Sequence, residues 1–166
     1  ELGFDHLTAD DLVQMSIHNV DADLIAMLNK AGLTDLAVDE LVQMSIHNVD
    51  AEFIDMMRAM GFTELSVRDL TSMSIHDVTA EFAAEMKAAG YVNLSADDLL
   101  RLRIHDVDGG YIESLREIGL ENLTVDELVD LRSHDVDAGF IEEARAAGLV
   151  DLSAERLLRL RSDRGR

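Results

Sequence analysis

The sequence contains no cysteine and no proline. The absence of cysteine excludes disulfides, cysteine-ligated zinc sites and catalysis by a thiol. The absence of proline, together with the lack of any run of glycine and serine, leaves no recognisable interdomain linker. The sequence therefore predicts a single repeat domain over residues 1–166.

Basic residues are scarce, with 14 Lys and Arg against 34 Asp and Glu and a net charge of −20. Binding to nucleic acid or to an anionic membrane requires a basic face, so we expect neither. No apolar run approaches the roughly 20 residues that cross a bilayer, which predicts a soluble protein without membrane insertion. Because the chain begins at Glu1 rather than at methionine, we also expect it to be a piece of a longer protein.

The dominant pattern is a repeat with a step of 29 residues. Leucine recurs at this step at Leu7, Leu36, Leu65, Leu94, Leu123 and Leu152. Glycine recurs at Gly32, Gly61, Gly90, Gly119 and Gly148. Histidine recurs at His18, His47, His76, His105 and His134. A fixed period of this length is typical of solenoids and other repeat arrays.

Each copy of the repeat predicts two short helices. In the copy from Leu94 to Asn122, apolar residues have helical spacing over 96–104 and again over 107–118. A hydroxyl residue followed three positions later by an acid forms a capping box at the start of the first helix. The pairs are Thr8 with Asp11, Ser66 with Asp69, Ser95 with Asp98, and Thr124 with Glu127. The second copy has Ala37 at the cap, so we expect its first helix to fray by ~1 kcal/mol.

The second helix of each copy has its own start and stop residues. The expected N-caps are Asp21, Asp50, Thr79, Asp108 and Asp137. The recurring glycine and the apolar residue after it suit a Schellman motif at the helix end. We therefore predict an all-α solenoid of tandem 29-residue helix–turn–helix repeats, with five full units and partial units at both ends. Helices of about ten residues are marginal alone and need packing against neighbouring repeats.

Three ladders of apolar residues are the predicted core. The inner ladder is Leu12, Leu41, Leu70, Leu99 and Leu128, and in the Leu94 copy we expect Ile104 to line the same side of the first helix as Leu99. The turn ladder is Val20, Val49, Val78, Val107 and Val136. The third ladder, expected between repeats, is Leu24, Phe53, Phe82, Tyr111 and Phe140.

The histidine ladder raises the question of metal binding. Stacked helical units lie roughly 8–10 Å apart, whereas each zinc ligand approaches its ion to about 2 Å. Histidines of neighbouring repeats therefore do not share an ion, and we expect them to satisfy free carbonyls at the end of the first helix. A cation-responsive module that uses each His with its neighbouring Asp or Asn remains an alternative function. No catalytic motif occurs and no cofactor is implied, so we expect no enzyme.

Two groups of residues are candidates for a partner-binding surface. Met27 and Met56 stand where other copies have Glu85, Ser114 and Glu143, which predicts an exposed, adaptable position. The C-terminal cluster with Arg159 and Arg161 either caps the array or binds an acidic partner. The first 57 residues hold twelve acids and only one base. A second copy of this chain is therefore one candidate for the acidic partner, in head-to-tail self-association.

The segment from Leu94 to His105, LSADDLLRLRIH, resembles short two-helix repeat tracts of bacterial proteins. Some of those tracts are appended to membrane-embedded zinc metallopeptidases of the antibiotic-sensor type, and others to regulatory proteins. The tracts often continue with Gly-Val and then Thr-Pro after the histidine. This chain has Asn or Asp in place of that glycine, and it contains no proline. The peptidase motif is absent, so no catalytic residue carries over. The resemblance implies an accessory module of a larger bacterial protein that makes protein contacts.

The sequence thus predicts a non-catalytic scaffold for protein–protein interaction. Two alternatives remain at this point, namely the cation-responsive module and a passive structural spacer.

Overall fold

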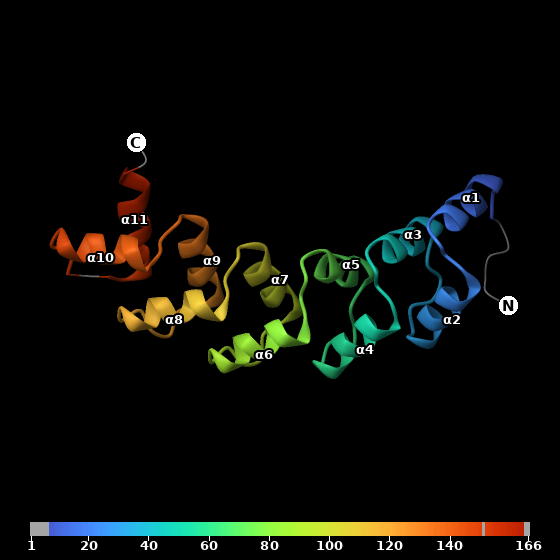
Figure 1. Cartoon of the computed structure of the whole chain (residues 1–166), viewed down its shortest axis with the longest axis horizontal. Coiled ribbons are helices and arrows are strands. Elements are labelled where there is room, and N and C mark those ends of the chain that lie inside the picture. Colours follow the sequence, from blue (N-terminus) through green and yellow to red (C-terminus); the bar gives the residue numbers. More distant parts are fainter. Residues whose placement is uncertain (1–6, 151, 165–166) are drawn as a thin grey trace. The chain divides into compact units, whose positions relative to one another are not determined.

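The computed structural model describes residues 7–150 and 152–164. Within these ranges the regular structure is entirely α-helical, with eleven short helices (Figure 1). The first helices of the repeats are α1 (Ala9–Ile17), α3 (Val38–Ile46), α5 (Val67–Ile75), α7 (Ala96–Ile104), α9 (Val125–Ser133) and α11 (Ala154–Arg164). The second helices are α2 (Ala22–Lys30), α4 (Ala51–Ala59), α6 (Ala80–Ala88), α8 (Gly109–Glu117) and α10 (Ala138–Ala146). The predicted solenoid of tandem helix–turn–helix repeats is confirmed, while its N-terminal partial unit lies outside the described residues.

The chain divides into two compact units, of which the first ends at Ala80 and the second begins at Glu81. Within the first unit, α1, α3 and α5 pack in one row, and within the second, α7, α9 and α11 do the same (Figure 1). The sequence of the first unit holds fifteen acidic and three basic residues, and that of the second holds nineteen and eleven. The prediction of one domain stays a prediction, and each unit is described by itself.

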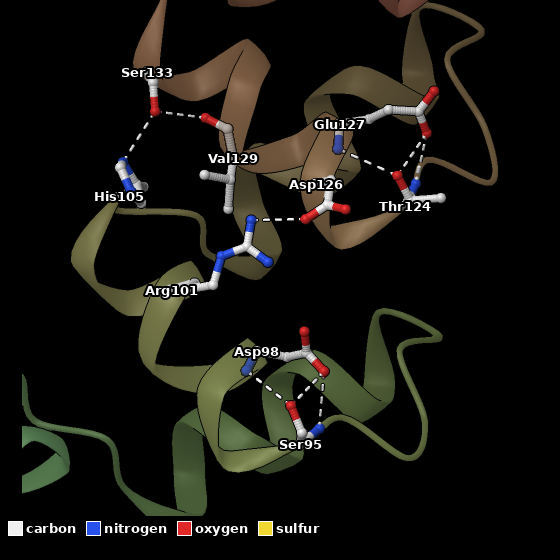
Figure 2. Close-up of polar contacts among 9 residues, drawn as sticks. All are labelled: Ser95, Asp98, Arg101, His105, Thr124, Asp126, Glu127, Val129 and Ser133. Atoms are coloured by element: carbon white, nitrogen blue, oxygen red, sulfur yellow. Dashed lines mark hydrogen bonds and ion pairs between the residues drawn. The ribbon is translucent and has the colours of Figure 1, made fainter. Parts of the chain in front are cut away.

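The predicted helix starts are present at the first helices. At α7 the Asp98 N–H donates to Ser95 Oγ (3.1 Å), and the Ser95 N–H donates back to the Asp98 carboxylate (3.0 Å; Figure 2). The same reciprocal box begins α1, α5 and α9. At α3, Ala37 has no side-chain acceptor, so only the Glu40 carboxylate contributes, by accepting from the Ala37 N–H at 2.9 Å.

The second helices begin with the predicted aspartates. Four carboxylates each accept the backbone N–H three residues on, at 2.7–2.9 Å: Asp21, Asp50, Asp108 and Asp137. The cap expected at Thr79 stays a prediction. Each carboxylate thereby pairs one of the backbone N–H groups that have no partner within the helix. This matters in a nine-residue helix, because such groups are a large share of its backbone donors.

The predicted glycine stop is confirmed at the second helices. The five recurring glycines have φ between 77° and 98°, the left-handed region that glycine adopts without strain. After Gly119, for example, the Leu120 N–H donates back to the Leu115 carbonyl at 2.9 Å, as in a Schellman motif. A β-carbon on Gly119 would meet no atom within 4 Å, so the backbone angle, not space, requires glycine there.

The first helices end in the same way, but with asparagine or aspartate in place of glycine. Their left-handed residues, with φ of 51–55°, are Asn19, Asn48, Asp77, Asp106 and Asp135. The Val107 N–H then donates to the Leu102 carbonyl at 2.9 Å. Asn and Asp are the non-glycine residues that best tolerate this region, because their short polar side chains bond locally. The residue after each histidine thus ends the first helix, a role that the sequence pattern did not indicate.

The core is confirmed in its main ladders and wrong at two positions. All five turn valines are buried, as are Leu41, Leu70, Leu99 and Leu128. Leu12 is 55% exposed, because the position is covered by the preceding repeat and no described repeat precedes α1. Ile104 is also exposed, because it lies on the outward face of α7, three residues beyond Arg101. In the third ladder Phe82, Tyr111 and Phe140 are buried, whereas Leu24 and Phe53 are half-buried.

Candidate interaction surface

The five recurring histidines each follow a first helix and take part in contacts at its end. The backbone carbonyl of His18 accepts from Ser45 Oγ in the next repeat (2.5 Å), and that of His47 accepts from Ser74 Oγ (2.5 Å). In the second unit the His134 carbonyl accepts from Arg161 Nε at 3.1 Å. The ends of α1, α3 and α9 therefore each have a carbonyl that is paired by a side chain of the next repeat, as a free helix end requires.

The histidine rings make two different contacts. His134 Nδ1 lies 2.8 Å from the Asp130 carbonyl within its own helix end, the kind of contact predicted from the sequence. His105 Nδ1 instead lies 2.9 Å from Ser133 Oγ of the next repeat (Figure 2). Among residues 7–150 and 152–164, no group of three or more metal-binding side chains is placed to hold an ion.

A second set of contacts closes the ends of the second helices. Arg58 donates to the Ala31 carbonyl, Arg116 to the Ala89 carbonyl and, at 2.7 Å, Arg145 to the Ile118 carbonyl. Each arginine lies 27 residues after its acceptor, so the bond always joins a repeat to the one before it. These arginines therefore link neighbouring repeats, and we call each such contact between a side chain and a helix end of the neighbouring repeat a joint.

Arginines of the second unit also cover the aromatic ladder. Three guanidinium carbons lie 4.9–5.0 Å from ring centroids: Arg103 over Phe82, Arg132 over Tyr111, and Arg161 over Phe140. This distance is that of a cation–π contact. The equivalent residues in the first unit are Ser16, Ser45 and Ser74.

The buried Tyr111 and the half-buried Tyr91 link repeats through their hydroxyls. Tyr111 Oη donates to the Val136 carbonyl at 2.7 Å, and Tyr91 Oη donates to the Leu123 carbonyl at 2.8 Å. Burial raises the pKa of both phenols. They therefore remain protonated donors at neutral pH.

The four predicted partner-binding residues have different surroundings within their own units. Arg161 is part of the joint with the preceding repeat, whereas Arg159 is exposed and pairs with Glu155 at 2.6 Å. Met27 and Met56 are half-buried, so the expectation of a fully exposed position was wrong. An apolar side chain at a helix edge lies against the protein, whereas Glu143 at the same position extends into water. The two methionines belong to the first unit and the two arginines to the second.

Open grooves lie between successive first helices of the first unit. The groove between α1 and α3 has a volume of ≈ 550 Å³, and that between α3 and α5 has a volume of ≈ 260 Å³. The first is lined by Asp11, Gln14, Ala37, Val38, Asp39, Val42 and Gln43. The second is lined by Asp39, Glu40, Gln43, Val67, Arg68, Thr71 and Ser72, so Asp39 and Gln43 line both grooves. Thr71 Oγ1 is a buried atom with no hydrogen-bond partner in the described part of the chain.

The equivalent groove of the second unit, between α7 and α9, is bridged by an ion pair. Arg101 stands where the first unit has Gln14, and it reaches Asp126 at 2.7 Å (Figure 2). Asp126 in turn stands where the first unit has Asp39. The bond to Asp126 raises the pKa of the Arg101 guanidinium.

A row of exposed isoleucines runs beside the open grooves. Ile17, Ile46 and Ile75 end α1, α3 and α5 and are 63%, 44% and 49% exposed. Each lies on the helix face that also carries the groove residue three positions earlier, namely Gln14, Gln43 or Ser72. At this position the second unit has Ile104 in α7, which is 46% exposed, and Ser133 and Ser162 in α9 and α11. We call the isoleucine row with its two grooves the first-helix face.

Comparison with known proteins gives no relative, because no family model, no curated protein and no solved structure matches the chain. No helix in the described ranges is long and apolar enough to cross a membrane.

Proposed function

We propose that this protein is a non-catalytic repeat scaffold that binds a protein partner on the first-helix face. The observation that carries the proposal is the row of Ile17, Ile46 and Ile75, large apolar side chains exposed at a fixed interval. Single exposed apolar residues are ordinary, but an aligned row beside grooves is the pattern of an interaction surface. Solenoids commonly use such extended faces to bind other proteins.

The chemistry of the rest of the molecule supports the same function. The recurring histidines and most of the arginines described above are used in joints between repeats, so they serve the architecture. The resemblance of the Leu94–His105 segment to bacterial repeat tracts suggests that the scaffold is an accessory module of a larger bacterial protein.

The test is affinity capture from a lysate of the source organism with the whole chain as bait. The variant Ile17→Ser, Ile46→Ser, Ile75→Ser places on the first unit the residue that the second unit has at Ser133 and Ser162, so its fold is expected to persist. We expect the partner to be lost with this variant and kept with a matched control, Met27→Glu with Met56→Glu. A partner kept by the serine variant and lost by the methionine variant would move the surface to the second helices. Capture of no partner by the native chain would favour the passive spacer.

A further inference from the structure

We propose that the groove between α1 and α3 binds the side chain of an arginine from a segment of the partner protein. The inference rests on the scaffold function and names the chemistry of its ligand. Its basis is a comparison of equivalent positions within the one molecule: the second unit fills this groove with an arginine of its own, and the first unit leaves the acceptor free.

The second unit shows what the groove accepts. Arg101 extends from α7 across the groove and donates through its terminal nitrogen to Asp126 Oδ1 on α9 (Figure 2). The equivalent pair in the first unit is Gln14 on α1 and Asp39 on α3. A glutamine side chain is shorter than that of arginine and carries no charge, so it supplies no counter-ion to Asp39.

The acceptor side of the first groove is available. Within the part of the chain that the structure describes, Asp39 makes no hydrogen bond and no ion pair, and it is exposed. Asp11 lines the same groove and is engaged at the start of α1, where Thr8 is its partner. The groove volume of ≈ 550 Å³ gives ample room for one long side chain. The excess of acidic residues in the first unit adds attraction for a cationic segment.

The surroundings define the rest of the ligand. Val38 and Val42 form an apolar floor along which the methylene groups of an arginine can lie. The exposed Ile17 and Ile46 beside the groove match an aliphatic residue next to the arginine in the partner. The planar guanidinium suits a carboxylate better than a lysine ammonium does, because it donates two parallel hydrogen bonds. The ligand class is therefore an exposed segment with an arginine flanked by aliphatic residues.

The α3–α5 groove does not repeat this chemistry. Arg68 stands there at the position equivalent to Asp39 in the first groove, and its charge offsets those of Asp39 and Glu40, which also line the second groove. The unpaired Thr71 hydroxyl instead offers a hydrogen bond to a neutral polar group. The two grooves together predict one arginine per bound segment.

The proposal is tested by NMR, because contacts of this exposed kind are weak. The probe is the synthetic peptide Gly-Ser-Leu-Arg-Leu-Ser-Gly, capped at both ends and added to the whole chain at physiological salt. We expect shifts at the amides of Gln14, Asp39 and Gln43, and about tenfold weaker binding when citrulline replaces the arginine of the probe. Shifts spread over acidic residues of both units, or none at Asp39, would overturn the proposal.

Four variants make the test specific. Gln14→Arg should fill the groove from within and abolish the shifts, whereas Asn29→Arg adds the same charge on α2 and should leave them unchanged. Asp39→Asn should weaken binding about tenfold, whereas Glu52→Gln removes an equal charge on α4 without effect. Shifts retained in Gln14→Arg would show that the peptide binds elsewhere.

A fifth variant tests whether the second unit can gain binding of the peptide. Arg101→Gln gives the second unit the residue of the first, so new shifts should appear at Asp126 in the presence of the probe. Binding confined to the first unit in this variant would contradict the equivalence of the two grooves. In the capture experiment, a partner lost with the serine variant yet kept by Gln14→Arg would preserve the scaffold function and overturn only the arginine site.

Discussion

At the ends of the first helices, the first unit joins its repeats through serine hydroxyls, and the second joins them through arginines. Ser45 and Ser74 donate to histidine carbonyls, whereas Arg132 and Arg161 donate to the Asp106 and His134 carbonyls while lying over aromatic rings. The joint thus requires a donor that reaches the open helix end, and either a short or a long side chain meets that need. Because the joint tolerates both, the exposed surface can change between units while the repeat is maintained.

The outer surfaces differ accordingly. The first unit presents three exposed isoleucines and open grooves, whereas the second keeps one such isoleucine, Ile104, and bridges α7 and α9 with Arg101 and Asp126. The same backbone therefore carries a surface suited to a partner in one unit and a surface suited to its own side chains in the other. The predictions below test this comparison.

The largest expected effect is at the aromatic ladder. Phe82→Ala removes a buried ring in the second unit and should lower the free energy of unfolding by about 3–5 kcal/mol. Phe53→Ala in the first unit should cost clearly less, because Phe53 is half-buried. Urea unfolding followed by circular dichroism measures both variants. Equal losses would show that the two units pack this ladder alike.

The next effect concerns two glycines of one repeat. Gly119→Ala forces a β-carbon on a residue with φ of 91° and should destabilise by about 1–2 kcal/mol. Gly110→Ala lies in the first turn of α8, where alanine should stabilise by about 0.5–1 kcal/mol. The changes in melting temperature should therefore have opposite signs. A melting temperature lowered by both substitutions would count against the left-handed stop.

Exchange of the joint residues should have a smaller effect. Arg132→Ser places the first unit's donor in the second unit and removes the guanidinium above Tyr111, for a loss of about 0.5–1 kcal/mol in urea unfolding.

The reverse exchange has an internal control. Ser74→Arg should stabilise by a similar amount, because Phe53 lies at the ring position beneath it. Ser45→Arg should not, since Leu24 stands at that position. Equal gains from both arginines would show that the aromatic ring plays no part.

The smallest effect is at the helix starts. Ala37→Ser should complete the missing capping box of α3 and stabilise by about 0.5–1 kcal/mol, whereas Ser95→Ala should destabilise by a similar amount. The Ser95 hydroxyl lowers the pKa of Asp98, whose ordinary value is 3.8. A lowered folded-state pKa gives stability that is full above the ordinary value and is lost as the pH falls through the folded value. The difference between the native chain and Ser95→Ala should therefore be constant near neutral pH and shrink below about pH 4, in thermal melts recorded across that range.

Much of the fold could be predicted because its determinants are local. The capping box of Ser95 and Asp98 and the stop at Gly119 each involve residues that are close in sequence, so their spacing alone predicts the helix ends. The left-handed Asp106 was also local, yet its role was hidden because aspartate is equally common in turns, caps and solvated faces.

The interaction surface was less predictable because it depends on how repeats stack. The donors Ser45 and Arg58 lie 27 residues from their acceptors, and only the packing of neighbouring repeats pairs them. The bridge from Arg101 to Asp126 likewise spans 25 residues. The exposed row that includes Ile46 was missed because helical spacing within one copy does not show which face the next copy covers. An alignment of the copies with attention to Gln14, Gln43 and Arg101 would have been the useful signal.

The joints described at the helix ends also have a direction, because in them the carbonyl is paired by a side chain of the repeat that follows. A ribosome releases the earlier repeat first, with its open carbonyls in water, and the donor emerges 27 residues later. Each new repeat therefore completes the helix ends of the one before it, and the open helix ends of a growing chain lie in its last repeat. The order of synthesis is thus also the order in which these joints can close.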